Sequence, residues 1–315
     1  MTMLRKSGKA ASTVPQIPRP HSGQTLGVVA PGSPISKDLL EAGCARLQRL
    51  GYKTFYFDSI LESDLYFAGA ATRRARELEE MFKREEIAGI ICARGGYGSN
   101  YLLPELNMDV IRAHPKMFMG YSDITTLLTY FCDHADMVTF HGPMVTADFA
   151  IDSSTVTAGV SLKFQYQTLS GETGSGEQPV TGEASGILYG GCLSMLAASL
   201  GTAYEIQTQG TILFIEDIAT KPFQIDRMLM QLKLAGKFTE VRGICFGEMV
   251  DCVQPKGQDY TLVEVIRRVL GDLDIPVGYG LRSGHVSAGG PNYCLPIGLP
   301  VNLTVADDRA TISSL

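Results

Sequence analysis

The sequence has no tryptophan and only five histidines in 315 residues. No apolar stretch approaches the roughly 20 residues that a membrane-spanning helix needs, so we expect no membrane association. The net charge is −6 and lysines and arginines form no run, which argues against a nucleic-acid partner. Because the histidines are dispersed, no local metal-binding pattern exists, and we expect neither a metal nor another cofactor.

Cysteine is sparse as well, and none of the seven cysteines belongs to a C-x-x-C pair. Most lie within apolar runs, which is typical of buried free thiols in a reducing compartment. Residues 1–24 begin with basic Arg5, Lys6 and Lys9 but lack the apolar segment of a signal peptide. We therefore expect a disordered tail at 1–24 and a cytoplasmic protein.

The sequence predicts an α/β protein of two domains, since hydrophobic residues make up 45% of the full chain and 315 residues exceed one ordinary core. Apolar strands alternate with helical patterns over 25–150, which predicts a parallel, doubly wound sheet. Residues 151–185 are rich in glycine, serine, threonine and glutamate, and are interpreted as a linker or flap. Structure resumes over 186–315, where the segment 292–315 is typical of antiparallel hairpins.

One stretch stands out for chemistry, Met117-Phe-Met-Gly-Tyr-Ser-Asp-Ile124. An apolar strand ends at Gly120, and helical spacing begins at Asp123, so Ser122 lies at an abrupt strand-to-helix turn. This is the placement of a nucleophile elbow, although Ile124 stands where the usual pattern has a second glycine. Ser122 is also a good helix N-cap, and the local sequence alone does not separate the two roles.

A serine nucleophile needs a histidine base. His285 follows a strand and a glycine, which suits a loop in a site, and His141 in Phe-His-Gly-Pro is a second candidate. His114 and His134 fall in or beside helices and are interpreted as exposed, while His21 belongs to the tail.

The nucleophile also needs an acid that orients the base, and donors for an oxyanion. Glu216 ends the apolar strand Thr211-Ile-Leu-Phe-Ile-Glu216, an unfavourable place for a carboxylate without a partner, and Asp217 is the alternative. The backbone of Asp123 and of the Gly95-Gly96 pair could supply the donors. The same glycine-rich loop could hold a phosphate, but it lacks both established nucleotide-binding patterns.

Six motifs occur in order along the chain. They are Arg94-Gly-Gly-Tyr-Gly98, Gly120-Tyr-Ser-Asp123, Phe140-His-Gly-Pro-Met144, Gly186-Ile-Leu-Tyr-Gly-Gly191, Phe214-Ile-Glu-Asp-Ile218 with Pro222-Phe-Gln-Ile-Asp-Arg227, and Gly284-His285. Together they resemble the LD-carboxypeptidase family of serine peptidases, which also contains the microcin C immunity peptidases. The resemblance extends from about Leu26 to the C-terminus.

The resemblance implies a catalytic triad of Ser122, Glu216 and His285. It also implies an oxyanion hole from Asp123 and a glycine of the Gly95-Gly96 pair, with Gly95 favoured. The implied fold is a flavodoxin-like N-terminal domain with a smaller mixed α/β C-terminal domain that completes the site, usually in a homodimer. Arg94, beside the oxyanion loop, is a candidate clamp for a substrate carboxylate, or else a member of a structural ion pair.

Within this family the substrate divides two ways. Carboxypeptidases remove the terminal D-alanine from murein tetrapeptides during cell-wall recycling, whereas immunity peptidases cleave aminoacyl-nucleotide amides and stack the adenine on an aromatic residue of a flap. The absence of tryptophan, with only Phe164 and Tyr166 in the candidate flap, favours the carboxypeptidase. Two further hypotheses are a non-enzymatic ligand binder, with Ser122 only a cap, and a cysteine hydrolase using Cys192. The sequence does not distinguish diaminopimelate from lysine in the stem peptide.

Overall fold

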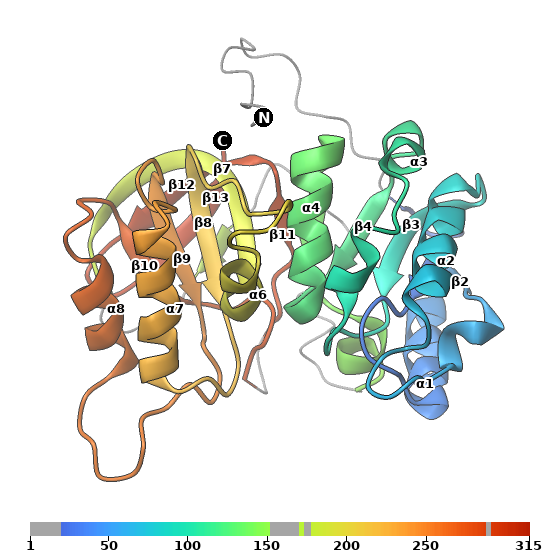
Figure 1. Ribbon diagram of the computed structural model, residues 1–315, viewed down its shortest axis with the longest axis horizontal. Coiled ribbons are helices and arrows are strands. Elements are labelled where there is room, and N and C mark those ends of the chain that lie inside the picture. The colour runs from blue at the N-terminus through green and yellow to red at the C-terminus, as the bar shows by residue number, and fades with distance from the viewer. Residues whose placement is uncertain (1–19, 152–169, 173–177, 288–290) are drawn as a thin grey trace.

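Two β-sheets form the framework of the protein and lie side by side, with α4 between them (Figure 1). The computed structural model describes residues 20–151, 170–172, 178–287 and 291–315. Most of the predicted tail and most of the predicted linker, including Phe164 and Tyr166, fall outside these residues.

The first sheet has six strands in the order β11-β5-β4-β3-β1-β2. These strands are β1 (Thr25–Val29), β2 (Lys53–Phe55), β3 (Ile87–Cys92), β4 (Met117–Gly120), β5 (Thr139–His141) and β11 (Leu295–Ile297). The first five are parallel, in the flavodoxin-like order 2-1-3-4-5, which confirms the predicted doubly wound sheet. β11 comes from the end of the chain and pairs antiparallel with β5.

The helices of this half follow the apolar spacing of the sequence. They are α1 (Lys37–Arg49), α2 (Ala71–Lys83), α3 (Met108–Ala113) and α4 (Thr125–Ala135). In α2, Ala75, Leu78 and Phe82 recur at three- and four-residue intervals and are buried, while Arg76 and Lys83 are exposed. Apolar side chains on both faces of the sheet form two separate cores.

The second sheet has seven strands in the order β10-β9-β8-β7-β12-β13-β6. These strands are β6 (Ser170–Glu172), β7 (Gly182–Cys192), β8 (Thr211–Glu216), β9 (Gly243–Gly247), β10 (Val277–Leu281), β12 (Pro300–Val305) and β13 (Ala310–Ser314). β7 to β10 are parallel, whereas β12 and β13 form an antiparallel hairpin, as the sequence pattern of residues 292–315 predicts. Mixed strand directions in this half are thereby confirmed.

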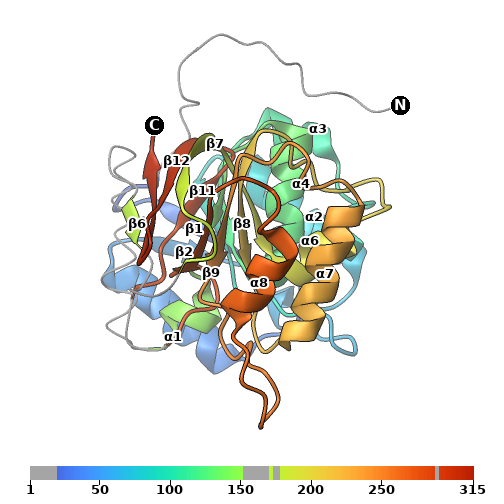
Figure 2. The same cartoon turned by 90° about the vertical axis from the view of Figure 1, so that its left-hand side faces the viewer.

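Three helices accompany the second sheet: α6 (Leu193–Ala198), α7 (Pro222–Leu234) and α8 (Leu262–Leu270). Figure 2 shows α7 and α8 side by side on one flank of the molecule. A third apolar core fills the space between these helices and the sheet. The division into domains at 150 and 186 stays a prediction, and β11 ties the last part of the chain to the first sheet.

Short turns of helix complete the framework, at η1 (Asp58–Leu61), η2 (Ser99–Leu102), η3 (Ser122–Ile124) and η4 (Val145–Phe149). All seven cysteines are free thiols, and six of them are buried, as their apolar surroundings predict. Across the described ranges, no helix is long and apolar enough to cross a membrane.

Candidate active site

Ser122 lies where β4 ends and η3 begins, with a backbone φ of 64°. A positive φ is uncommon for a residue other than glycine and concentrates at functional turns. Gly120 permits this turn, because a Cβ there would lie 2.9 Å from Cγ2 of Ile124 and 3.1 Å from Cβ of Cys92. The structure therefore has the strained strand-to-helix turn of a nucleophile elbow, with Ile124 buried where the pattern has its second glycine.

The glycine-rich loop after β3 lies directly against this turn. A Cβ on Gly95 would approach Ser122 Oγ to 3.1 Å, whereas one on Gly96 would meet Oγ of Ser33 instead. Asp123 is the second residue of η3, where a backbone N–H has no acceptor within its own turn. Its buried carboxylate accepts the Ser99 N–H at 2.9 Å, which fixes the far end of the loop. Burial raises the pKa of Asp123 despite the bonds that it accepts.

Glu216 and His285 meet at the carboxyl ends of β8 and β10. Oε2 of Glu216 lies 2.6 Å from Nδ1 of His285 and accepts its backbone N–H at 3.1 Å. Glu216 is fully buried, whereas the side chain of His285 is 15% exposed. A carboxylate bound to Nδ1 orients an imidazole and leaves Nε2 available for proton transfer.

A second histidine faces the same carboxylate. Nε2 of His141 lies 3.6 Å from Oε1 of Glu216, slightly beyond hydrogen-bond length, and Nδ1 lies 3.0 Å from Oγ of Ser283. His141 is fully buried, so it has no access to a substrate. Of the five histidines, His21, His114 and His134 are exposed, as predicted for the last two. The geometry favours His285 over His141 as a base.

The contacts between Glu216 and the imidazoles of His141 and His285 shift the pKa values of Glu216 and His285. Burial alone would raise the pKa of Glu216, but the close approach and charge of His141 and His285 outweigh it and lower the pKa to about 2. Burial would lower the pKa of His285, yet its bond to Glu216 and the charges of Glu216, Asp217 and Asp148 raise the pKa above its ordinary value. Glu216 is therefore ionised at neutral pH, and the His285 imidazolium is stabilised.

Tyr121 connects the nucleophile turn to this pair. Its ring lies edge-on to the His285 imidazole, with centroids 5.1 Å apart and planes at 87°. This contact places the turn that contains Ser122, the next residue, near the Glu216–His285 pair. Within the described part of the chain, no hydrogen bond joins Ser122 to His285, which is common in unliganded hydrolases because such bonds tighten when substrate binds.

The other sequence candidates have separate positions. Arg94 is exposed beside Gly95, and its Nη1 donates to the Pro34 carbonyl at 3.2 Å. Among the described residues Arg94 has no carboxylate partner. Asp217 accepts bonds from Ser194 and Ile218, away from His285. Cys192 is buried and burial raises its pKa well above the ordinary thiol value, which does not favour a cysteine nucleophile.

Sequence reasoning missed several residues that support the site. Arg74 is buried and donates to the carbonyls of Pro31, Gly69 and Gly98, which joins three loops around the glycine-rich segment. In the sequence it is one of several arginines in a charged helix, so no local signal marked it. Asp148 and Asn292 also contact the site from distant parts of the chain.

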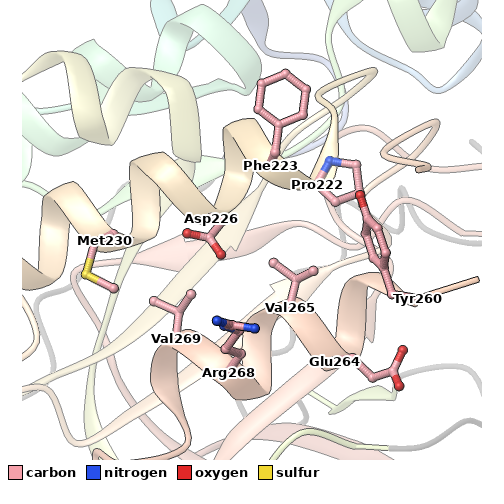
Figure 3. A pocket seen from close by; sticks show the side chains of 9 residues that line it. All are labelled: Pro222, Phe223, Asp226, Met230, Tyr260, Glu264, Val265, Arg268 and Val269. Atoms are coloured by element: carbon pink, nitrogen blue, oxygen red, sulfur yellow. The ribbon is translucent and has the colours of Figure 1, made fainter. Parts of the chain in front are cut away.

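A groove of about 660 Å³ opens elsewhere, between α7 and α8 (Figure 3). Phe223, Asp226 and Met230 line it from α7, and Val265 and Arg268 from α8. None of the residues named above as site candidates lines this groove, so it is not the catalytic cleft.

Comparison with known proteins agrees with this geometry. Residues 26–142 match the family model of the LD-carboxypeptidase N-terminal domain, and residues 185–303 match that of the LD-carboxypeptidase C-terminal domain. The probable murein peptide carboxypeptidase of Bacillus subtilis is 36% identical over 299 residues, which are 93% of each protein. The chain belongs to the LD-carboxypeptidase family.

This LD-carboxypeptidase family member is a serine-type hydrolase. Its relatives include both murein peptide carboxypeptidases and a microcin self-immunity protein. The microcin C7 self-immunity protein MccF of Escherichia coli is 30% identical, over 92% of the chain and 93% of MccF. The crystal structure of muramoyltetrapeptide carboxypeptidase from Oxalobacter formigenes superposes with a TM-score of 0.83 at 26% identity, over 93% of the chain and 99% of that protein. The resemblance seen in the sequence is confirmed over both halves.

Proposed function

We propose that this protein is a serine carboxypeptidase that hydrolyses the amide between diaminopimelate and the terminal D-alanine of murein tetrapeptides, in peptidoglycan recycling. The observation that carries the proposal is the buried Glu216 carboxylate bound to Nδ1 of His285 at 2.6 Å, beside the turn that presents Ser122. Relatives named as murein peptide and muramoyltetrapeptide carboxypeptidases support the substrate class.

In the proposed reaction, Ser122 Oγ attacks the carbonyl of the LD amide while Nε2 of His285 accepts its proton. Glu216 orients the imidazole and stabilises the imidazolium, as its lowered pKa allows. The N–H groups of Asp123 and Gly95 stabilise the tetrahedral oxyanion. His285 then protonates the leaving amine of D-alanine, and water, activated by the same imidazole, hydrolyses the acyl-enzyme to the tripeptide.

The test is release of D-alanine from purified murein tetrapeptide, with an aminoacyl-sulfamoyl adenosine as the competing substrate. We expect D-alanine release and slower hydrolysis of the nucleotide conjugate, because the sequence has no tryptophan to stack the base. Preferential hydrolysis of the nucleotide conjugate would instead assign the protein to an immunity-type function, which the similarity to MccF makes the alternative.

The pH dependence of kcat/KM should report His285 as the base. Since Glu216, Asp217 and Asp148 raise its pKa, the activity should increase with pH through a midpoint above the ordinary value of 6.5, where the imidazole becomes neutral. The measurement is kcat/KM for the tetrapeptide from pH 5 to 9. A midpoint at or below 6.5 would contradict the Glu216–His285 assignment.

Arg94 is proposed to bind the free α-carboxylate of the D-alanine. Arg94→Ala should lower kcat/KM by about 10- to 100-fold, the range expected for one charge-assisted hydrogen-bonding contact. A tetrapeptide ending in D-alaninamide provides the control, since amidation should impair the wild type but have little further effect on Arg94→Ala. If Arg94→Ala and the wild type are equally sensitive to amidation, Arg94 does not bind the carboxylate.

We further propose that the protein acts in the cytoplasm, where its free thiols stay reduced.

We also propose that the protein is a homodimer. Phe223 and Met230 in the groove of Figure 3 are 50% and 37% exposed, and such apolar surface is typical of interfaces. Light scattering should give twice the chain mass of 34.1 kDa. A mass of one chain at micromolar concentration would refute the dimer.

A further inference from the structure

A second, partly buried network lies behind the proposed triad, centred on Asp148 in η4. Its Oδ2 accepts the Met144 N–H at 2.8 Å, and its Oδ1 accepts Nδ2 of Asn292 at 3.2 Å. The hydroxyl of Tyr121 also interacts with this carboxylate. Asp148 therefore joins its own turn to Asn292 and Tyr121, which come from two distant segments of the chain.

Asn292 carries the network to the histidine loop. Its Nδ2 donates to the Gly284 carbonyl and its Oδ1 accepts the Gly284 N–H, both at 3.0 Å. This pair of hydrogen bonds fixes the backbone of Gly284, the residue directly before His285. Asn292 is 2% exposed, so water does not replace these contacts. An aspartate there would lack the donors that Gly284 and Asp148 both require.

Gly284 must remain close to the catalytic groups. Its φ of 83° favours glycine, and a Cβ would lie 2.6 Å from Cε1 of His141 and 2.9 Å from Cδ of Glu216. The loop thus has little freedom on its inner side. On its outer side it is held by Asn292, and through Asn292 by Asp148.

The network also extends to Tyr121, the residue before the proposed nucleophile. Tyr121 directly precedes Ser122, is 7% exposed, and places its ring edge-on to His285. The interaction of its hydroxyl with Asp148, at the far end of that ring, restrains the tilt of the ring and, through the backbone, the strained turn at Ser122. Asp148 thereby interacts with the residue before the proposed nucleophile and is hydrogen-bonded, through Asn292, to the residue before the proposed base.

We propose that Asp148 is a positioning residue that, through Tyr121 and Asn292, holds the Ser122 turn and the His285 loop at the separation that proton transfer requires. The proposal rests on the proposed roles of Ser122 and His285. Ser122 comes from the first sheet and His285 follows a strand of the second, so their separation depends on how the two halves are joined. A displacement of about 1 Å between reacting groups can lower the rate about 100-fold.

Asp148 also contributes charge to His285. The Tyr121 ring and Glu216 contact this imidazole, the more distant carboxylates Asp217 and Asp148 act on it through their charge, and His141 lies on the other oxygen of Glu216. Removing one negative charge from this set makes the imidazolium less stable. Asp148→Asn should therefore move the acid limb of the pH profile to lower pH, whereas a purely structural residue would leave the midpoint unchanged.

The experiment compares the full-length wild type, Asp148→Asn and Tyr121→Phe. We expect each variant to lower kcat for tetrapeptide hydrolysis by about 10- to 100-fold with KM within about threefold, because the reacting groups are misplaced and the binding surface is retained. The acid limb should shift downward in Asp148→Asn and less in Tyr121→Phe, which keeps the carboxylate. Tyr121→Phe also retains the ring, so it tests the network if Asp148→Asn folds poorly.

Tyr189→Phe is the matched control. The Tyr189 hydroxyl donates to Oδ2 of Asp133 at 2.6 Å in the core of the second sheet, so the variant also removes a buried tyrosine–aspartate bond. It should lower the thermal midpoint as Tyr121→Phe does and leave kcat unchanged. Equal kcat in Tyr121→Phe and Tyr189→Phe, with an unshifted pH midpoint in Asp148→Asn, would overturn the positioning role.

Labelling of Ser122 by a fluorophosphonate separates this proposal from the choice of substrate. The wild type should be labelled at Ser122, and Asp148→Asn should be labelled about 10- to 100-fold more slowly, since the reaction needs the same serine and histidine geometry. Equal labelling rates would refute the positioning role while leaving the triad intact. An unlabelled wild type would refute the triad, and with it this proposal.

Discussion

Ser122→Ala is expected to lower kcat for D-alanine release by about 10⁴- to 10⁶-fold, the loss typical of removing a catalytic serine. The reason is that no other described hydroxyl replaces Ser122 Oγ at the end of β4, against Gly95 and beside Tyr121 and His285. The substitution removes one atom from a turn that already has a φ of 64°, so the fold should be retained. The measurement is D-alanine released from murein tetrapeptide, followed by mass spectrometry.

Ser185→Ala controls for the loss of a serine hydroxyl as such. Ser185 lies in β7 and its Oγ donates to Oδ1 of Asn302, on the hairpin side of the second sheet. Its activity should equal that of the wild type. Equal D-alanine release by Ser122→Ala and Ser185→Ala would exclude Ser122 as the nucleophile and leave it a structural role in the turn, although not that of a helix cap, since Tyr121 and Ile124 are the N-cap residues of η3 and α4.

Glu216→Gln should have the second largest effect, a decrease in kcat of about 10³- to 10⁴-fold. Oε2 of Glu216 accepts from both Nδ1 and the backbone N–H of His285, and it stabilises the imidazolium that forms during the reaction. A glutamine amide at this position has one acceptor oxygen and can present a donor to Nδ1, which favours the wrong tautomer. Without the carboxylate the pKa of His285 should also fall, which NMR titration of the imidazole would detect.

Asp217→Asn distinguishes the two adjacent carboxylates. Asp217 bonds Ser194 and Ile218 rather than His285, so its loss should reduce stability and change kcat by less than about tenfold. A larger decrease in kcat for Asp217→Asn than for Glu216→Gln would assign the orienting acid to Asp217.

The stability of the Glu216 site should depend on pH in a defined window. Because folding lowers the pKa of Glu216 from 4.5 to about 2, its contribution is complete above 4.5 and is lost as the pH falls toward 2. The raised pKa of His285 works in the opposite direction, so its contribution is complete below 6.5 and is lost as the pH rises through the folded pKa. The difference in the free energy of unfolding between wild type and Glu216→Gln should therefore be largest between pH 4.5 and pH 6.5.

The sequence alone determined the secondary-structure elements and the types of residue that are candidates for catalysis. The apolar run Met117–Met119, Gly120 and the helical spacing after Asp123 specify a strand, a turn and a helix through interactions between near neighbours. The alternation of strands and helices before residue 150 specifies a parallel sheet, and six ordered motifs indicated the family. The candidates Ser122, Glu216 and His285 followed from residue type and from position at strand ends.

Only the tertiary structure decided which distant residues act together. The pairing of β8 with β9 and of β9 with β10 sets Glu216 beside His285, and the antiparallel contact of β11 with β5 accompanies the return of the chain past Asn292 toward Asp148. His141 and His285 look alike in the sequence, since each follows an apolar strand. Burial separates them, because one imidazole is enclosed behind Glu216 and the other reaches the surface of the site. Local patterns record spacing along the chain, whereas these contacts join segments more than 60 residues apart, and they arise only when the strands pack side by side.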